Sequence, residues 1–471
     1  MFDLARESSY PTPLAHSAFL PLMLMSLASQ KNSPSPTRTP NSIRSEYDYI
    51  IGYHGKDGPV TIETIPYNPK LKMKVLEGVE EMGYEILDSN AARQTGFYIS
   101  QGNLRNGQRC STAKAYLVPA ENRPNLDILP NAFVHKVNIK NGQAVGVTFD
   151  VNGTIHKVAA KKEVIMSAGT VNSAQLLMLS GIGPKEELKK HGIPLVADLP
   201  VGKNLQDHCS ALNLYTLDSS IPPFPELISS NRSFQQYINN RTGPLSSLEG
   251  LVATAFLNNG YIRPKFDNPN YQLYITAADA KSLKQLGLTD EAYRQTYQPY
   301  EGRSVYLCDS EVLQPKSRGT VTLQSADPHK PPLIDPNYFA VSEDLEDIVE
   351  GIKTCQRLSE TQAMKSIGAK PLDTVYPGCE KFQKYSDDYY RCHARSAQLT
   401  QSHEVGTAKM GHPNDPTTVV DPELRVKGIK GLRVVDASIM PIVPSGNTNI
   451  PTIMIAEKAS DIIKGSIHCQ N

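Results

Sequence analysis

The stretch SEYDYIIGYHGKDGPV (45–60) joins two sequence patterns that are normally separate. Its residues 47–51, YDYII, form an apolar β-prone run that is typical of the first strand of a nucleotide-binding sheet. Such a strand normally leads into a glycine-rich turn and a helix, whose backbone N–H groups bind a pyrophosphate. Here GYHGKDGPV (52–60) follows instead, and the chain contains no G-x-G-x-x-G motif. The fold and chemistry therefore have to be inferred from the rest of the sequence.

The composition is that of a globular protein of two or three domains. The chain has 471 residues, of which 39% are hydrophobic, and this is enough for more than one core. Lys and Arg together number 48, as do Asp and Glu, so no overall positive charge favours nucleic acid. No run of about 18 apolar residues is present, and no membrane-spanning helix is expected.

The N-terminal residues 1–45 are expected to lie outside the folded domains. AFLPLMLMSLAS (18–29) has the length and the small final residues of a signal-peptide core, and a Pro/Ser-rich linker follows it. N-glycosylation sequons are present at Asn152, Asn231 and Asn240. These features predict an extracellular, secreted protein.

The cysteines leave two interpretations open. There are seven, at 110, 209, 308, 355, 379, 392 and 469, and none forms a C-x-x-C pair, so no metal cage is expected from them. In a secreted protein Cys379 and Cys392 could close a short disulfide loop. The alternative is that all seven are scattered free thiols.

Hydrophobic periodicity predicts several elements of the first half. Leu71, Val75, Val79 and Met82 recur at helical spacing and predict a surface helix. Residues 126–169 alternate apolar and polar side chains and contain two Asn-Gly pairs, which predict an antiparallel meander followed by a buried strand, EVIMSAG. A glycine-terminated helix is expected over residues 169–183.

The second half has a less regular pattern at first. Residues 205–300 predict loops and short helices around a ligand-facing region. Further on, strands are expected at 304–315, 319–323 and 431–438, and helices at 343–358 and 451–465.

Several kinds of chemistry find no support in the motifs. The chain has no G-x-S-x-G nucleophile elbow and no phosphate-binding P-loop. HEVGT (403–407) begins like a zinc-protease helix, but Thr407 stands where the second histidine would be needed. Acidic pairs such as Asp387 and Asp388 are expected to be solvated, which disfavours a glycosidase.

Four blocks, in order, resemble the glucose-methanol-choline (GMC) oxidoreductases, particularly their insect glucose-dehydrogenase-like branch. They are residues 109–129 (RCSTAKAYLVPAENRPNLDIL), 169–183 (GTVNSAQLLMLSGIG), 199–208 (LPVGKNLQDH) and 402–461, which begins SHEVGTAKMG and includes PSGNTN. The resemblance spans roughly residues 46–465. Within it, Ala174 replaces the usual Pro or Ser, a change that concerns a helix start.

The resemblance implies an α/β fold with two domains. A truncated Rossmann-like flavin domain would comprise residues 46–210, completed by 420–471, and a mixed-sheet substrate domain would comprise 211–419. The glycine-rich turn, the acidic residue for the ribose and the flavin cover of the family have no counterpart here. On the order of a hundred residues are thus expected to be absent between Ile51 and Gly52, as in a splice variant or a gene-model error.

The same resemblance implies an FAD-dependent oxidoreductase that acts on the CH–OH group of a small alcohol or sugar. His403 matches the catalytic base, and its ordinary pKa of about 6.5 leaves a neutral fraction at physiological pH. Asn447 matches the second active-site residue, where an amide can donate a hydrogen bond to the developing alkoxide. Flavin contacts would come from Val134, Asp436, Ala437, Thr448, Asn449 and Pro451.

Two other hypotheses about the function stay open at this point. Without the glycine-rich turn the chain loses the main-chain donors and the helix dipole that bind the pyrophosphate, so FAD affinity should be weakened. The alternative function is therefore a non-catalytic GMC-like protein without FAD. A flavoprotein that has become a lyase is a third reading.

Overall fold

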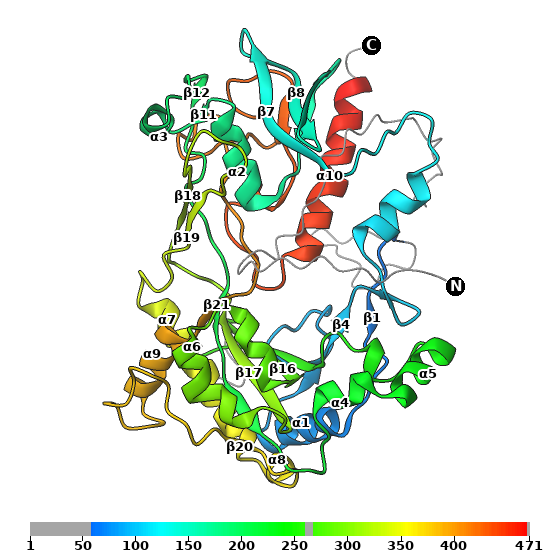
Figure 1. The fold of residues 1–471 in the computed structure, drawn as a ribbon, viewed down its shortest axis with the longest axis vertical. Helices are drawn as coiled ribbons and strands as arrows, with labels where there is room; N and C mark the ends of the chain where they lie inside the picture. The colour runs from blue at the N-terminus through cyan, green and yellow to red at the C-terminus, as the bar shows by residue number, and fades with distance from the viewer. Residues whose placement is uncertain (1–57, 260–266, 469–471) are drawn as a thin grey trace, which may run out of the picture.

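The computed structural model describes residues 58–259 and 267–468. The predicted signal peptide at 18–29 and the predicted strand at 47–51 lie outside these residues. The described chain forms two parts, one above the other in Figure 1. Helices and sheets occur in both, in agreement with the α/β class implied by the resemblance. The predicted domain limits at 46–210, 211–419 and 420–471 stay a prediction.

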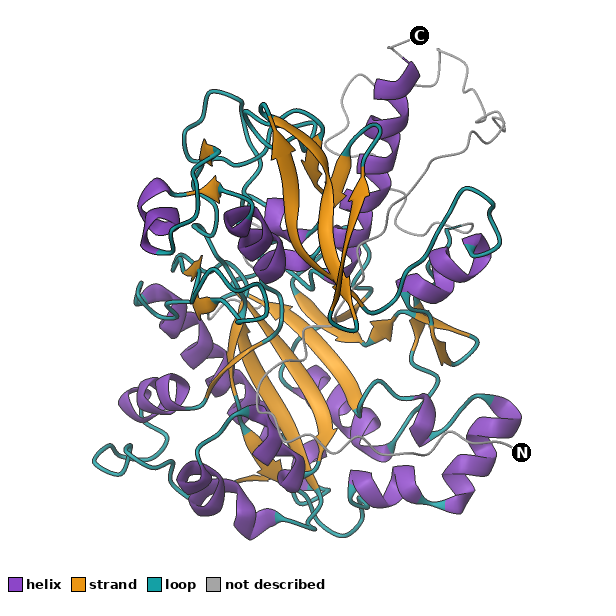
Figure 2. Ribbon diagram, turned by 45° about the horizontal axis from the view of Figure 1, so that its top comes forward, coloured by secondary structure: helices purple, strands orange, loops and turns teal. Residues whose placement is uncertain are grey.

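The lower part is built on a nine-stranded sheet, seen nearly face-on in Figure 2. Its central strands are β15 (Leu251–Leu257), β16 (Tyr271–Ala278) and β17 (Val305–Val312), which pair antiparallel. β2 and β3 pair in parallel at one edge, so the sheet is mixed. The other strands are β2 (Ile86–Leu87), β3 (Gly96–Ile99), β13 (Cys209–Ala211), β14 (Leu214–Thr216), β20 (Lys370–Pro371) and β21 (Gln398–Thr400).

The prediction of loops and short helices over 205–300 is wrong where β15 and β16 form. Both strands lie in the middle of the sheet and are largely buried, so their sequences, LVATAFL and YQLYITAA, lack a clean polar alternation. Such short apolar runs do not distinguish a buried strand from a buried helix by periodicity alone. Pairing with strands that are distant in sequence, β3 for β15 and β17 for β16, determines their conformation.

Helices pack on the sheet through their apolar faces. α7 (Glu343–Ser359) buries Leu345, Ile348 and Ile352 and lies against β17, where Ser310 donates a hydrogen bond to the Ile348 carbonyl at 2.9 Å. Gly351 permits this close approach, because a Cβ there would collide with the Ser310 side chain. The predicted surface helix forms as α1 (Lys70–Glu81). α8 (Gln362–Lys365) and α9 (Asp387–Ser396) complete this layer.

Two disulfides hold the lower part. Cys379–Cys392 closes the short loop that the sequence suggested, and Cys308–Cys355 joins β17 to α7. The alternative of scattered free thiols is therefore wrong for these four residues. Among the described cysteines, Cys110 and Cys209 are free and buried, and the seventh lies outside the described residues.

The upper part contains the predicted meander: β7 (Ala132–Lys140), β8 (Gln143–Val151) and β9 (Thr154–Ala159). At both Asn-Gly pairs the two residues have positive φ, between 51° and 79°, as a type I′ hairpin turn requires. The buried strand β10 (Val164–Met166) pairs in parallel with β22 (Leu432–Val434). The helix α2 (Gly169–Leu179) follows β10, and the closing helix is α10 (Asn449–His468). These predictions are confirmed.

Shorter elements complete the chain. Two-stranded pairs are formed by β1 (Glu63–Thr64) with β4 (Gln101–Gly102), β5 (Leu104–Arg105) with β6 (Gln108–Arg109), β11 (Ile182–Gly183) with β12 (Ala197–Asp198), and β18 (Thr320–Thr322) with β19 (Leu333–Asp335). The remaining α-helices are α3 (Lys185–Lys190), α4 (Phe224–Ser229), α5 (Asn231–Asn240) and α6 (Asp290–Ala292).

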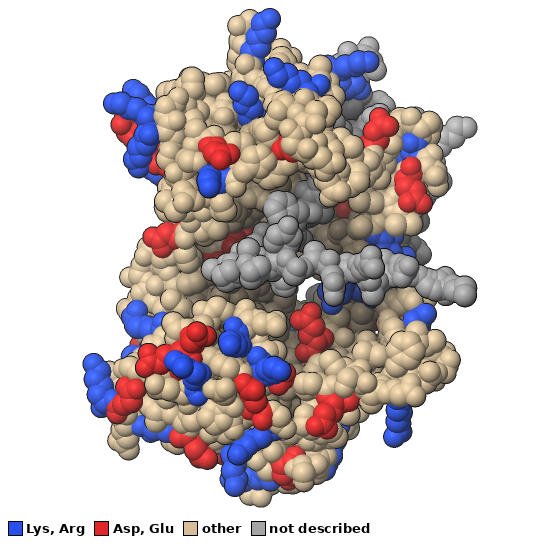
Figure 3. All heavy atoms as spheres, in the orientation of Figure 1, with Lys and Arg blue, Asp and Glu red and all other residues tan. Residues whose placement is uncertain are grey.

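The surface drawn in Figure 3 carries basic and acidic side chains interspersed with one another. The equal numbers of the two charge types in the sequence are thus matched by local mixing on this face. In the part of the chain that the structure describes, no helix combines the length and apolar character needed to cross a bilayer.

Candidate functional site

The fold brings His403 and Asn447 together, although they are distant in sequence. His403 follows β21 at the edge of the large sheet, and Asn447 lies just before α10. The Asn447 Nδ2 atom is 3.2 Å from the His403 Nε2 atom and donates a second hydrogen bond to the Tyr274 hydroxyl at 2.7 Å. An amide nitrogen has two hydrogens, so it can serve both partners when Nε2 of His403 carries no proton. His403 is 8% exposed and Asn447 is exposed, so the pair forms the outer end of a buried group.

Behind His403 lie two residues that complete an inner cluster of His208, Glu311 and His403. The Nδ1 atoms of the two histidines are 3.0 Å apart. Glu311 Oε1 is 2.9 Å from His208 Nδ1 and 3.4 Å from His403 Nδ1. His208 also donates from Nε2 to the Leu313 carbonyl at 3.0 Å, because a carbonyl can only accept. The side chains of His208 and Glu311 are fully buried.

The electrostatics of the inner cluster make Glu311 a carboxylate and His403 a stronger base. Burial opposes the charge on Glu311, yet its contacts with His208 and His403 outweigh that effect and lower the pKa of Glu311. Burial likewise opposes protonation of His403, but its contact with Glu311 and the charge of that group raise the pKa of His403. Neither carboxylate oxygen of Glu311 has a hydrogen-bond partner among the described residues, so the nearby histidine rings are the neighbours that stabilise its charge.

The neighbouring strands explain why these residues meet. β13 pairs with β17 on one side, in the register Ser210 to Glu311, and with β21 on the other. His208 directly precedes β13, and His403 follows β21 by three residues. The cluster therefore spans three adjacent strands of one sheet, which holds its groups in place.

Asp207 fixes the backbone that carries His403. Its carboxylate accepts the His403 backbone N–H at 2.9 Å and the Thr400 hydroxyl at 2.6 Å, and the Tyr338 hydroxyl donates to it as well. Ser402, just before His403, has a φ of 56°, a left-handed conformation that these contacts hold in place. Asp207 is thus a positioning residue for His403.

The block LPVGKNLQDH (199–208) also holds the segment that leads to Asn447. Gln206 donates to the Pro441 carbonyl at 3.0 Å and accepts the Val443 N–H at 3.2 Å. Asn204 donates to the Gly406 carbonyl at 3.3 Å. This short block thereby supports both halves of the pair.

Sequence reasoning missed Glu311, His208, Asp207 and Tyr274. His208 and Asp207 fall within a block whose resemblance was noted, and that block was the available signal. Glu311 and Tyr274 lie in strands whose partners are far away in the chain, and no local pattern marks them.

The predicted flavin contacts fall into two places. Thr448, Asn449 and Pro451 lie at the beginning of α10, directly after Asn447. Ala437 lies beside the His403 segment, because its carbonyl accepts the Gly406 N–H at 3.4 Å. Val134 lies in β7, where it packs against the core of the upper part.

The side chain of Asp436 has a partner within the protein. It accepts the Gly169 N–H at 3.0 Å and the Ser173 hydroxyl at 2.6 Å, at the beginning of α2. It also accepts the Ser438 N–H at 2.9 Å. Its negative charge thus already occupies the N-terminus of the helix that follows β10.

Three large apolar side chains between residues 442 and 454 are exposed. Ile442 is 70% exposed, Ile450 41% and Met454 62%. They lie in the same stretch of chain as Asn447.

Comparison with known proteins gives a consistent result. Family models described as GMC oxidoreductase match residues 35–210 and 315–456. The chain is 41% identical over 418 residues to glucose dehydrogenase [FAD, quinone] of Drosophila pseudoobscura pseudoobscura, covering 88% of this chain and 65% of that protein. It is 39% identical to alcohol dehydrogenase [acceptor] of Pseudomonas putida, covering 87% of this chain and 71% of that one.

A solved structure shows the same fold. A formate oxidase variant of Aspergillus oryzae, studied for its FAD modification, matches with a TM-score of 0.74 and 26% identity, over 87% of this chain and 73% of that chain. The protein described here thus spans about two thirds of the length of its Drosophila relative, 65%.

Proposed function

Because the chain belongs to the GMC oxidoreductase family, we propose that it is an FAD-dependent oxidoreductase acting on the CH–OH group of a small alcohol or sugar. The observation that carries this proposal is the contact between His403 and Asn447, 3.2 Å, with Glu311 buried behind the histidine. A base and a neutral hydrogen-bond donor side by side are what proton removal from a hydroxyl requires.

His403 would take the hydroxyl proton at Nε2. For this the proton of the neutral ring must sit on Nδ1, which faces Glu311 and His208. The Glu311 carboxylate favours that tautomer and stabilises the cation that forms when Nε2 is protonated. Asn447 would then turn one N–H from Nε2 to the alkoxide oxygen, and Tyr274 would hold the other. FAD, when bound, supplies the acceptor for the carbon-bound hydride.

The residues present fit the reactive end of FAD but not its pyrophosphate. Backbone groups at the start of α10 and the apolar side chains of Ile442, Ile450 and Met454 suit a flat, partly apolar ring system. The pyrophosphate needs a helix N-terminus free to accept an anion. In the described residues, the strand β10 leads into α2, whose N-terminus Asp436 already occupies. We therefore expect FAD to bind weakly, with Thr448, Asn449, Pro451, Asp436, Ala437 and Val134 as contacts.

The second candidate function is a GMC-like protein without FAD or catalysis. The occupied N-terminus of α2 and the lack of a G-x-G-x-x-G motif in the sequence favour it. It predicts a folded, colourless protein that does not take up added FAD.

A flavin titration of the purified full chain separates the two functions. The proposed oxidoreductase should contain less than one FAD per chain after purification, bind added FAD with quenching of flavin fluorescence, and then oxidise an alcohol or sugar with an artificial electron acceptor. A folded chain that leaves the fluorescence of saturating FAD unchanged would refute the proposal and support the second function.

We also propose that the protein is secreted. The disulfides Cys308–Cys355 and Cys379–Cys392 support this, because such bonds persist in oxidising compartments. Expression in insect cells should place the protein in the medium with an N-terminus beyond residue 29. Retention inside the cells with residues 1–29 intact would contradict secretion.

A further inference from the structure

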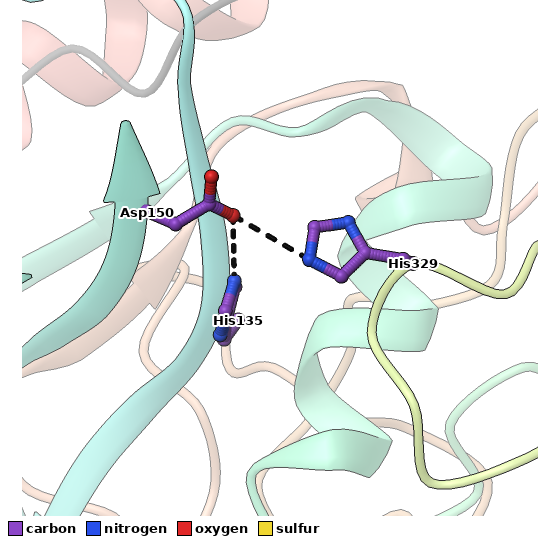
Figure 4. A group of neighbouring side chains, drawn as sticks. All are labelled: His135, Asp150 and His329. Carbon is purple, nitrogen blue, oxygen red and sulfur yellow. Dashed lines mark hydrogen bonds and ion pairs between the residues drawn. The ribbon is translucent and has the colours of Figure 1, made fainter. Parts of the chain in front are cut away.

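A second group of two histidines and one carboxylate lies on the upper part, outside the proposed active site (Figure 4). This outer cluster consists of His135, Asp150 and His329. The Asp150 Oδ2 atom is 2.8 Å from His135 Nε2 and 3.5 Å from His329 Nε2. One nitrogen from each ring and one carboxylate oxygen lie within 4.8 Å of one another. In Figure 4 both imidazole rings present a nitrogen to the same carboxylate oxygen.

The fold brings the three side chains together from two hairpin strands and one loop. The pairing of β7 with β8 places Phe133 opposite Asp150, and the register shifts between Val134 and Lys136, so His135 is the additional residue of a bulge. Phe133 and His135 are two residues apart, and their rings are 5.9 Å apart on the same side. A bulge of this kind directs a side chain that regular pairing would place elsewhere.

The loop that carries His329 is anchored independently of the cluster. Its turn is closed by Asp327, which accepts the His329 N–H at 3.0 Å. Gln175 of α2 donates to the Lys330 carbonyl at 2.8 Å. The Phe133 ring stacks on the His329 ring, with centroids 4.6 Å apart and planes 18° apart. The histidine is therefore held over the hairpin by groups that are not ligands.

We propose that His135, Asp150 and His329 form a zinc-binding site. Zinc binds imidazole nitrogens together with carboxylate oxygens, whereas magnesium and calcium favour oxygen ligands alone. Two ligand atoms at about 2.0–2.1 Å from one tetrahedral zinc ion lie about 3.3 Å apart. The two distances between the carboxylate and an imidazole, 2.8 and 3.5 Å, bracket this value, and the two imidazole nitrogens lie within 4.8 Å of each other.

The surroundings supply the other requirements of a zinc site. The second oxygen of Asp150 accepts the Gly153 N–H at 3.1 Å, which orients the carboxylate. The His329 side chain is 56% exposed, whereas those of His135 and Asp150 are 17% and 11% exposed, so an ion can enter from solvent and keep a water ligand. The inner cluster also has two histidines and one carboxylate but is enclosed by the sheet, with His208 and Glu311 fully buried.

The spacing of the cysteines predicted no metal site, and the proposed zinc site contains no cysteine, so the two statements are compatible. His329 is far from His135 and Asp150 in sequence, so no motif with a fixed spacing predicts the site. The inference does not depend on the proposed oxidoreductase activity. The bound ion would link the hairpin to the loop before β19 and act as a structural clip.

Zinc titration of the chelator-treated full chain tests the proposal. A competing chromophoric chelator should report one zinc ion per chain, and zinc should raise the melting temperature, while magnesium should not. His329→Ala should weaken zinc binding by at least ~10- to 100-fold and abolish the rise in melting temperature. His329 is suitable for this test because its exposed side chain can be removed with little effect on folding.

A neighbouring histidine provides the matched control. His156→Ala removes an exposed imidazole from β9, where it stacks on Phe149 in the same meander, and should leave zinc affinity unchanged. Asp150→Asn, checked for folding by circular dichroism, should weaken binding as His329→Ala does. Absence of stoichiometric zinc binding to the wild type, or equal affinity in wild type and His329→Ala, would overturn the proposal.

Discussion

The inner and outer clusters contain the same kinds of side chain in different surroundings. Each has a carboxylate between two imidazoles, and each rests on paired antiparallel strands. In the inner cluster Glu311 and His208 are fully buried, whereas His329 of the outer cluster is largely exposed. Burial removes water as a competitor for the charges, so the inner group is suited to holding and moving a proton. Access to solvent suits the outer group to receiving an ion. Two histidines and one carboxylate thus have different chemistry in the two clusters because their burial differs.

The strongest test of this contrast is His403→Ala in the FAD-supplemented protein. Turnover of the alcohol or sugar should fall by ~10²–10⁴-fold, because general-base catalysis is lost. Steady-state kinetics with an artificial electron acceptor would measure it. His412→Ala, which removes an exposed histidine, should retain wild-type turnover. Equal turnover in the His403 variant and the wild type would contradict the assignment of the base.

Asn447→Ala should have a smaller effect on the same reaction. It removes the hydrogen bond to the alkoxide while leaving the base in place, so we expect a loss of about 10²-fold in kcat, the lower end for one such donor. The variant also removes the hydrogen bond that the Tyr274 hydroxyl accepts from Asn447. If kcat is unchanged and only KM rises, Asn447 binds the substrate without stabilising the transition state.

Glu311→Gln should alter the pH dependence of the inner cluster. Because Glu311 raises the pKa of His403, its loss should move the acid limb of the kcat/KM profile to lower pH. At alkaline pH kcat should fall on the order of 10-fold, part of the general-base contribution, since the negative charge that stabilises protonated His403 is lost. Histidine NMR titration of the flavin-free chain provides a readout besides activity. An unshifted His403 titration would show that Glu311 does not act on it.

His403 and Glu311 also make the folding stability of the protein depend on pH, and their two contributions change in opposite directions with pH. The folded state raises the pKa of His403, so its stabilising contribution is present below the unfolded pKa of about 6.5 and is lost as pH rises through the folded value. The folded state lowers the pKa of Glu311, so that contribution is present above the unfolded value of about 4.3 and is lost as pH falls through the folded value. Urea unfolding of wild type and Glu311→Gln across this range should converge at acidic pH.

The smallest effect is expected in the outer cluster without metal. His329→Ala in zinc-free buffer should unfold at the same urea concentration as the wild type, because its side chain is largely exposed and water screens its charge. A clear loss of stability in the absence of zinc would show that the three side chains form a structural network by themselves, in contrast to the proposed metal site.

Local sequence patterns were informative where the structure is local. The Asn-Gly pairs at 141 and 152 specify the hairpin turns, because both residues of each pair adopt positive φ. The helical spacing of Leu71, Val75 and Val79 specifies α1. The resemblance of separated blocks implied His403 and Asn447, and the structure brings them within 3.2 Å. Their catalytic roles stay a prediction.

By itself, the sequence determined the hairpins, the amphipathic helices and the family, since each depends on neighbouring residues or on ordered blocks. Only the tertiary structure decided that Glu311 and His208 stand behind the base, and that His329 meets His135 and Asp150. The tertiary structure also decided that Asp436 occupies the N-terminus of α2. The physical reason is that pairing between strands and burial from solvent depend on residues distant in the chain, and these set both the neighbours of a titratable group and the cost of its charge.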